Sequence, residues 1–243
     1  MASEPIVFFD LPTRAPVKAW SLNPWRTRFV LNYKGLNYKT EWVEYPDIKA
    51  RLEGHVTPNA GDPSYTIPAI RLPDGKYVMD SYKIADELEK QHPAPPLHLG
   101  APVQLRLVEL LKRVHPPFFG IFATGVPKNL LSAASIPYWY RTRSEDVGMP
   151  LDEYSRLKGG EVAFAAMAPH MRAITELLKQ TPDGPFFMGK ELSYTDFIWA
   201  GFLIFVRNVD GEAFERALEL SGDGQAHRDL LEALKPWSER DDH

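Results

Sequence analysis

The sequence predicts an α/β part over residues 1–91 and an all-helical part over residues 101–243, joined by a linker at 92–100. The first part alternates short apolar runs with helical patterns in the order β-α-β-α-β-β-α. The second part has apolar residues at three- and four-residue spacing, which is typical of helices. The linker contains the proline-rich run 92–96, which cannot be helical.

The first three predicted elements form a β-α-β unit. Residues 6–9 are a continuous apolar run, as expected of a strand buried on both faces. A helical pattern then extends to Gly35, and a second strand is predicted at 38–44. Such a short unit implies a parallel strand pair with a right-handed crossover. A short helix is predicted at 47–53, inside a long loop.

A hairpin and a helix complete the predicted α/β part. Its strands, at 66–72 and 77–79, are separated by residues 73–76, whose Pro-Asp-Gly-Lys sequence favours a tight turn. Asp80 and Ser81 then open a helix. Pro68 stands near the start of its strand, where a proline is tolerated.

The second half is predicted to consist of helices around one central helix. The segment that begins at Ser193 is apolar on every face, which is typical of a helix at the centre of a domain. Ser193 and Asp196 form a variant capping box at its start. Residues 123–150 are expected to be irregular and are rich in aromatic residues. Helices are predicted at 101–122, 151–180, 193–207, 212–220 and 226–235.

Composition and motifs exclude several classes of function. The net charge of −4 over 243 residues argues against a nucleic-acid partner, which would need a basic surface. No apolar run approaches the ~18 residues of a membrane span, and no signal peptide is recognised, so a cytoplasmic protein without membrane contact is expected. No metal-ligand spacing, phosphate-binding loop or dinucleotide motif is found, so no metal is expected.

The chain contains no cysteine. Disulfides, cysteine-ligated zinc and a cysteine nucleophile are therefore excluded. If the protein performs thiol chemistry, the thiol must belong to a ligand.

The first predicted helix begins in an arrangement that suits an anion. Asn23 is a good N-cap, and Pro24 suits the first helical position because its missing N–H would be unpaired there. Gly35 ends the helix, where a left-handed residue is needed. Ser21 lies just before the helix. A hydroxyl and several free N–H groups thus meet at the positive end of a helix, which stabilises negative charge.

Four short motifs occur in order along the chain: Ser21 with Asn23-Pro24-Trp25, the pair Ile67-Pro68, the pair Asp80-Ser81, and the Ser193–Asp196 box. In this order they resemble the cytosolic glutathione transferase family over nearly the whole chain. The blocks 25–36 and 38–48 are similar to the etherase-related fungal class, FuA. The resemblance implies a thioredoxin-like N-terminal domain followed by an all-helical C-terminal domain.

The resemblance also implies roles in binding glutathione. Ser21 would donate a hydrogen bond to the glutathione thiolate, with Asn23 as a second donor. Ile67 would pair with the cysteinyl backbone next to a cis Pro68. Asp80 would contact the γ-glutamyl ammonium and Ser81 the γ-glutamyl carboxylate. The ordinary alternatives are a turn serine, a strand-start proline and an N-cap pair.

Two further groups of residues are candidates for the same site. A cation is expected near the glycyl carboxylate, and the sequence does not choose among Lys39, Lys49, Arg51 and His55; Lys39 and Lys49 are retained. A hydrophobic electrophile pocket is expected between the domains, although aromatic residues at this spacing are more often core. Its predicted lining is Trp20, Phe118, Phe119, Phe122 and Tyr138.

The predicted function is that of a detoxifying glutathione transferase. Glutathione would be the co-substrate and hydrophobic aromatic compounds the electrophiles, with cleavage of β-aryl ethers as a plausible reaction. The alternatives are a ligandin that sequesters aromatic compounds and a non-catalytic assembly domain. The resemblance also implies a homodimer.

Overall fold

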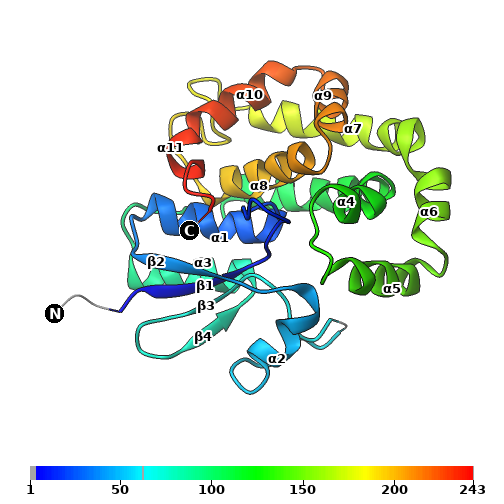
Figure 1. Cartoon of the computed structure of the whole chain (residues 1–243). Coiled ribbons are helices and arrows are strands. Elements are labelled where there is room, and N and C mark those ends of the chain that lie inside the picture. Colours follow the sequence, from blue (N-terminus) through cyan, green and yellow to red (C-terminus); the bar gives the residue numbers. More distant parts are fainter. Residues whose placement is uncertain (1–3, 62, 243) are drawn as a thin grey trace.

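The structure is a computed structural model that describes residues 4–61 and 63–242. An α/β part packs against a helical part, with the chain passing once between them (Figure 1). The outer ends of the predicted ranges, residues 1–3 and 243, lie outside the described residues. The elements of the α/β part are β1 (Ile6–Asp10), α1 (Leu22–Tyr33), β2 (Tyr38–Trp42), a 3-10 turn (Tyr45–Asp47), α2 (Ile48–Leu52), β3 (Ala69–Arg71), β4 (Tyr77–Met79) and α3 (Ser81–Gln91).

The four strands form one mixed sheet in the order β2-β1-β3-β4. β1 is parallel to β2 and antiparallel to β3, and Phe8 lies opposite both Thr40 and Ile70. All five residues of β1 are buried, as its apolar run predicts. The helices α1 and α3 lie toward the helical part, whereas α2 lies at the far end of the sheet (Figure 1). The thioredoxin-like prediction is confirmed.

The helical part is arranged around α8. Its residues from Tyr194 to Val206 are all buried, and the capping box of Ser193 and Asp196 is present at its start. No helix in the described parts of the chain is long and apolar enough to cross a membrane. The helices are α4 (Pro102–Asn129), α5 (Ile136–Val147), α6 (Leu151–Lys158), α7 (Gly160–Leu178), α8 (Tyr194–Val209), α9 (Gly211–Leu220), α10 (Gly224–Ala233) and α11 (Lys235–Ser238).

Two sequence-based expectations for this part are wrong. The segment 123–150 is mostly helical, because α4 continues to Asn129 and α5 follows. The single helix predicted at 151–180 is broken between α6 and α7, where the chain passes very close to α4. A Cβ atom added at Gly120 would lie only 2.3 Å from the carbonyl oxygen of Lys158, so only glycine permits this approach.

A buried hydrogen-bond network ties α10 to α7 and α8. The Trp199 indole Nε1–H donates to His227 Nδ1 at 2.9 Å, so that nitrogen must carry no proton. His227 Nε2 lies 2.8 Å from the Thr175 hydroxyl, which also lies 2.8 Å from the carbonyl oxygen of Ser221. Burial lowers the pKa of His227 to about 4, so the ring is neutral near neutral pH.

We expect His227 to make the fold sensitive to acid. As the pH falls, the unfolded chain binds a proton near pH ~6.5, while the folded chain does so only near a pKa of about 4. Between about pH 7 and about pH 5 this difference costs about 2 kcal/mol of unfolding free energy. Glutamine at this position binds no proton, so the unfolding free energy of His227→Gln lacks this pH dependence. The difference in unfolding free energy between the native protein and the variant should therefore shrink by about 2 kcal/mol from about pH 7 to about pH 5. Urea unfolding at both pH values measures it, and parallel pH profiles would contradict it.

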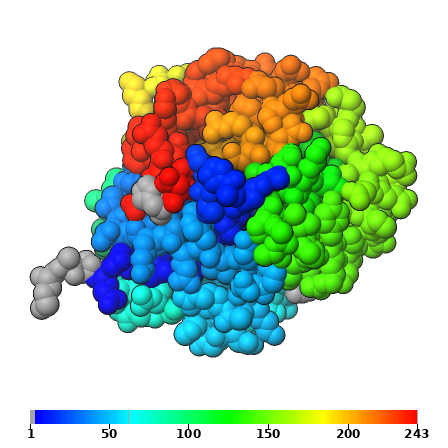
Figure 2. Space-filling view, in the orientation of Figure 1, coloured from blue at the N-terminus to red at the C-terminus, as the bar shows by residue number. Residues whose placement is uncertain are grey.

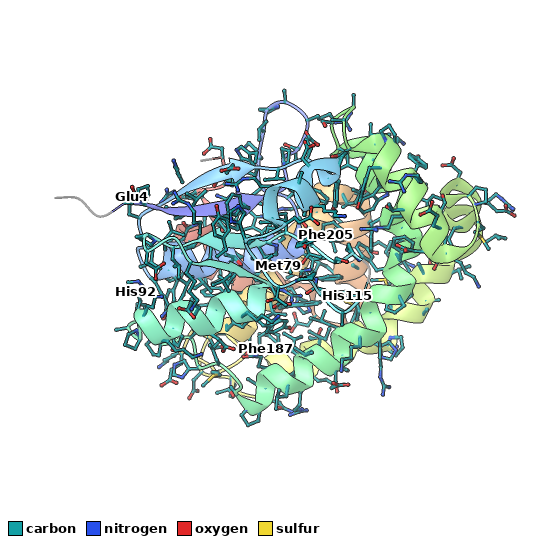
Figure 3. All side chains as sticks on the ribbon, turned by 90° about the horizontal axis from the view of Figure 1, so that it is seen from below. Glu4, Met79, His92, His115, Phe187 and Phe205 are labelled. Atoms are coloured by element: carbon teal, nitrogen blue, oxygen red, sulfur yellow. The ribbon has the colours of Figure 1, made fainter. Side chains whose placement is uncertain are left out.

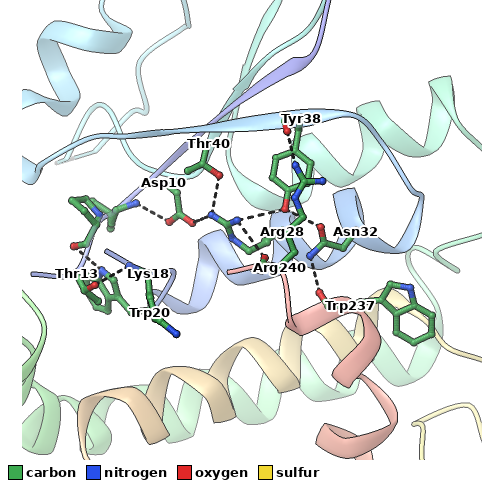
Figure 4. Close-up of polar contacts among 12 residues, drawn as sticks. Asp10, Thr13, Lys18, Trp20, Arg28, Asn32, Tyr38, Thr40, Trp237 and Arg240 are labelled. Carbon is green, nitrogen blue, oxygen red and sulfur yellow. Dashed lines mark hydrogen bonds and ion pairs between the residues drawn. The ribbon is translucent and has the colours of Figure 1, made fainter. Parts of the chain in front are cut away.

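A buried ion pair lies where the sheet meets α1. The Arg28 guanidinium contacts the Asp10 carboxylate at 2.8 Å, and both side chains are fully buried (Figure 4). Arg28 also lies 5.0 Å from the ring centroid of Phe8 and 5.4 Å from that of Trp42. Burial raises the pKa of Asp10 above its ordinary value, against the lowering effect of Arg28.

The C-terminal tail attaches to the same region. Asn32 Nδ2 donates to the carbonyl oxygen of Trp237 at 2.7 Å, and the Arg240 guanidinium donates to the carbonyl oxygen of Tyr38 at 2.6 Å (Figure 4). The Ala19 N–H donates to the carbonyl oxygen of Asp241 at 2.7 Å. The loop before α1 is visible at the surface, between this tail and α4 (Figure 2). The tail therefore connects α1, β2 and the loop that leads to Ser21.

Candidate active site

The helix α1 begins two residues earlier than the sequence indicates. Ser21, with extended φ −79° and ψ 138°, is the N-cap, and its carbonyl oxygen accepts the Trp25 N–H at 3.0 Å. Asn23 is therefore the second helical residue, and Pro24 the third. Proline is tolerated there because the first-turn N–H groups have no partner within a helix. The predicted end of the helix is confirmed, since Gly35 follows it with φ +62°.

The Ser21 hydroxyl is not used to cap the helix. Among the described residues, no hydrogen bond engages Ser21 Oγ. The peptide N–H groups of Leu22 and Asn23 belong to the open first turn of α1. A hydroxyl donor and the positive end of a twelve-residue helix thus face the same space.

The pairs Ile67-Pro68 and Asp80-Ser81 lie together. The Asp80 N–H donates to the carbonyl oxygen of Pro68 at 3.1 Å, and the Ile67–Pro68 peptide is cis. The ladder between β1 and β3 ends at Ala69, so the peptide of Ile67 lies outside it. Asp80 caps α3 by accepting the Tyr82 N–H at 2.8 Å, in a backbone conformation with φ +88°. A non-glycine residue in such a conformation is uncommon and often marks a functional site.

A cavity of about 640 Å³ brings these motifs together between the α/β and helical parts. Seven of the residues predicted for the site line it: Ser21, Asn23, Ile67, Pro68, Asp80, Ser81 and Tyr138. Its other lining residues come from the loop after β1, α1, the 3-10 turn, α2, the loop before β3, α3, α4 and α5.

Positive charge dominates the lining of this cavity. Arg26, Lys112 and Arg143 line it, whereas Asp80 is the one carboxylate among its described lining residues. Arg26 is only 5% exposed. Its guanidinium lies 5.5 Å from the ring centroid of Tyr82, but no ion pair or hydrogen bond engages it within the described chain. A buried cation without a counter-ion is costly, so this cavity suits an anion.

His115 lies beside Arg26 in the same lining, on the inner side of α4 (Figure 3). Its Nε2 atom is buried, and no group in the described residues partners it. Burial and the nearby Arg26 charge lower the pKa of His115 to about 4. His115 is therefore neutral near neutral pH and adds no charge to the cavity.

The structure does not bring Lys39 or Lys49 to the cavity. Lys39 is exposed on β2, the edge strand of the sheet. Lys49 is exposed on α2 and pairs with Glu53 at 3.8 Å. The two alternatives lie elsewhere as well: Arg51 pairs with Glu41, and His55 stacks on the ring of Tyr77.

A second cavity, of about 440 Å³, adjoins the first and is mostly apolar. Trp20, Phe119 and Phe122 line it, as predicted, together with Trp139 and Phe205. Phe118 does not line either cavity: it is fully buried and packs against Phe122, Phe202 and Phe205, so it belongs to the core.

Comparison with known proteins identifies the fold. The N-terminal domain of glutathione S-transferases matches residues 20–91, and the C-terminal domain of these enzymes matches residues 108–237. The chain belongs to the glutathione S-transferase family. A glutathione S-transferase-like protein of Aspergillus flavus, ustS, is 31% identical to it, over 97% of this chain and 91% of that protein.

Crystal structures of fungal glutathione transferases resemble this transferase closely. GSTFuA3 from Phanerochaete chrysosporium is 31% identical with a TM-score of 0.82, over 97% of this chain and 98% of that one. A glutathione S-transferase of Ceriporiopsis subvermispora in complex with glutathione is 31% identical with a TM-score of 0.82, over 96% of this chain and 98% of that one. The predicted similarity to the FuA class is confirmed, and this transferase is an enzyme.

Sequence reasoning missed several residues that line the cavities of this transferase. Arg26 and Tyr45 stand inside the sequence blocks that resemble the FuA class, but no pattern gave either a role. His115 follows no motif. Arg143 lies in the segment 123–150, which was expected to be irregular. Only the spacing of Tyr138, Trp139 and Arg143 on one helix could have placed them together, and that helix was not predicted.

Proposed function

We propose that this transferase binds glutathione in the larger cavity and stabilises its thiolate through Ser21. The observation that supports the proposal is the position of Ser21. Its hydroxyl makes no capping hydrogen bond to α1, and the residue is half-buried and lines both cavities. The serine hydroxyl is too weak an acid to form the alkoxide that could act as a base, so its role is that of a hydrogen-bond donor. Asn23 lies in the same helical turn and is a second donor.

The energy required is within reach of these groups. A thiol with a pKa near ~8.5 is mostly protonated at neutral pH, and only the thiolate is a strong nucleophile. Lowering the pKa by one unit takes about 1.4 kcal/mol of preferential stabilisation of the thiolate. A hydroxyl donor and a helix N-terminus together supply about one to two such units. Since the chain lacks cysteine, this thiolate belongs to glutathione.

The remaining groups of the larger cavity suit the rest of glutathione. Ile67 offers a free peptide edge to the cysteinyl backbone, and Ser81 lies at the start of α3, where a carboxylate is favoured. Asp80, the one carboxylate among the described lining residues of this cavity, suits the γ-glutamyl ammonium. Arg26 supplies a buried counter-ion for a glutathione carboxylate, in place of Lys39 and Lys49.

The apolar cavity would hold the electrophile. Its walls are the rings of Trp20, Phe119, Phe122 and Trp139, and Ser21 forms part of its rim. An aromatic compound seated there would meet the thiolate directly. We propose hydrophobic aromatic electrophiles as substrates, with aryl ethers among them.

Replacing Ser21 with alanine tests the proposal. We expect the pKa of bound glutathione to rise by one to two units in Ser21→Ala, which lowers kcat/KM with a chloronitrobenzene by about 10- to 100-fold below neutral pH. The gap should shrink as the pH rises above the pKa of the free thiol. The ultraviolet absorbance of the thiolate, titrated in the complex, reports the pKa directly.

The matched control is Ser64→Ala, at an exposed loop serine outside both cavities. It should leave the thiol pKa and the rate unchanged. Equal turnover in native protein and Ser21→Ala would refute the role of Ser21. Turnover of the native protein no faster than the uncatalysed rate, with tight binding of aromatic dyes, would favour the ligandin alternative, which the apolar cavity also fits.

A further inference from the structure

Four residues line both cavities and mark the passage between them: Ser21, Leu22, Tyr45 and Arg143. Three of the four carry a polar group, namely a hydroxyl, a phenol and a guanidinium. If Ser21 holds the thiolate, as proposed above, then an electrophile that reaches it from the apolar cavity must pass Tyr45 and Arg143. The function of these two residues is therefore a question about the electrophile.

Tyr45 is held firmly at this passage. Its ring stacks on Tyr138 with centroids 5.9 Å apart, and it meets Trp139 edge-on at 5.6 Å. Its backbone N–H donates to Ser135 Oγ at 3.0 Å, which fixes it to the start of α5. Burial raises the pKa of the phenol, so it stays protonated. No hydrogen bond to any other described residue engages its hydroxyl, which is therefore available to donate to a ligand.

Arg143 supplies a positive charge at the same passage. Its guanidinium lies 5.0 Å from the ring centroid of Trp139 and 3.3 Å from the carboxylate of Asp146. The Arg143 side chain is 23% exposed and that of Asp146 is 63% exposed, so this ion pair is weak. The guanidinium also donates to Thr142 Oγ1 at 3.4 Å, and because it has five N–H groups, Arg143 can bind a further oxygen while it keeps both partners.

We propose that Tyr45 and Arg143 receive the negative charge that develops on the leaving oxygen when the electrophile is an aryl ether. The proposal rests on the proposed function of Ser21 and concerns a different step. Halide ions leave without such help, whereas a phenolate is a poorer leaving group. A donor and a cation placed where its charge forms lower the barrier to its departure.

The reaction is balanced without another reactant. The glutathione thiol loses its proton to solvent on binding, and the thiolate sulfur attacks the carbon that bears the aryloxy group. The new C–S bond forms as the C–O bond breaks, and the electron pair of the C–O bond leaves on oxygen. Arg143 pairs with the phenolate, and Tyr45 donates a hydrogen bond to it. The phenolate takes a proton from solvent, so glutathione and the ether give a thioether and a phenol.

The test compares leaving groups on one carbon. Phenacyl aryl ethers with phenols of differing acidity are measured beside phenacyl chloride, since the thiolate attacks the same carbon in each. In Arg143→Met and Tyr45→Phe, we expect kcat/KM for the ethers of the weakest acids to fall by about 10- to 100-fold, which corresponds to one lost hydrogen bond to a charged group. The rate with phenacyl chloride should change by less than about threefold. In both variants the ether rate should fall more steeply, as the pKa of the leaving phenol rises, than it does in the native protein.

Three controls keep the outcomes separate. Arg141→Met removes an exposed arginine of the same helix that lines neither cavity, and it should change nothing. Arg143→Lys retains the charge and should restore part of the ether rate. The thiolate absorbance of bound glutathione is measured in every variant and each rate is expressed per thiolate, because Arg143 also lines the cavity proposed for glutathione.

The outcomes decide the two proposals separately. Equal losses with ethers and chloride, an unchanged slope, or a native enzyme that converts the chloride but no ether would overturn the role of Tyr45 and Arg143 and leave Ser21 standing. A native enzyme with no thiolate and no turnover of either class would overturn the proposed function itself.

Discussion

Arg28→Met should destabilise this transferase by about 3–5 kcal/mol, because it leaves the fully buried Asp10 carboxylate without its counter-ion. The variant also loses the guanidinium that lies against the rings of Phe8 and Trp42. Urea unfolding near neutral pH, followed by tryptophan fluorescence and by circular dichroism, measures the loss.

The pH dependence distinguishes this cause from a simple packing defect. The pKa of Asp10 is already raised by burial, and removing Arg28 raises it further. A carboxyl group with a raised folded-state pKa contributes most stability at acid pH and loses it as the pH rises through that pKa. The deficit of Arg28→Met should therefore be smaller at about pH 5 than at about pH 8. A deficit independent of pH would contradict the explanation, and Arg216→Met, which breaks exposed ion pairs, should change stability little.

Arg26→Met should have opposite effects on stability and on binding. Arg26 is buried and has no counter-ion in the described chain, so the ligand-free variant should be as stable as the native protein or more stable. Glutathione should bind about 10- to 100-fold more weakly, since one charge-assisted contact to a carboxylate is lost. Calorimetric titration gives the affinity. Thermal unfolding without glutathione gives the change in stability, and the shift of the unfolding temperature on adding glutathione gives the change in binding.

Lys112→Met is the matched control for Arg26. Lys112 lines the same cavity but is exposed, so water already compensates its charge. Its loss should change the affinity by less than about threefold. Unchanged glutathione affinity in Arg26→Met would show that Arg26 does not contact glutathione.

The fold could be predicted where local patterns and the final packing agree. The strand at 77–79 occurs with the predicted bounds, and the apolar helix after Ser193 is central, as its composition indicates. The helices within 123–150 could not be predicted, because Pro127 lies in the last turns of α4 and Pro137 at the start of α5. Prolines argue locally against a helix, and only the burial of its apolar face against α7 and α8 outweighs them.

The residues of the candidate site fall into the same two groups: some follow from local motifs, and others depend on how the whole chain packs. Ser21 and Asp80 could be predicted, because each lies at a helix start with its own physical reason, whereas Ile67 could be predicted only from the family resemblance. Arg26 could not, since its importance lies in the lack of a counter-ion, which depends on every element around it. Lys49 looks equivalent in sequence to a binding lysine, and only the position of α2 shows that it is exposed. Phe118 and Phe119 are neighbours in sequence, yet one is core and the other lines a cavity.

The attachment of the tail to α1 and β2 has a consequence for synthesis of the protein. A chain emerges from the ribosome N-terminal end first, and its first half starts to fold while the second is still being made. Here the bonds from Trp237, Arg240 and Asp241 to Asn32, Tyr38 and Ala19 must wait until residues 237–241 have emerged. The bond from Asp241 to the loop that leads to Ser21 therefore forms late, so a nascent chain that has already folded its sheet and α1 does not yet hold Ser21 in its final position.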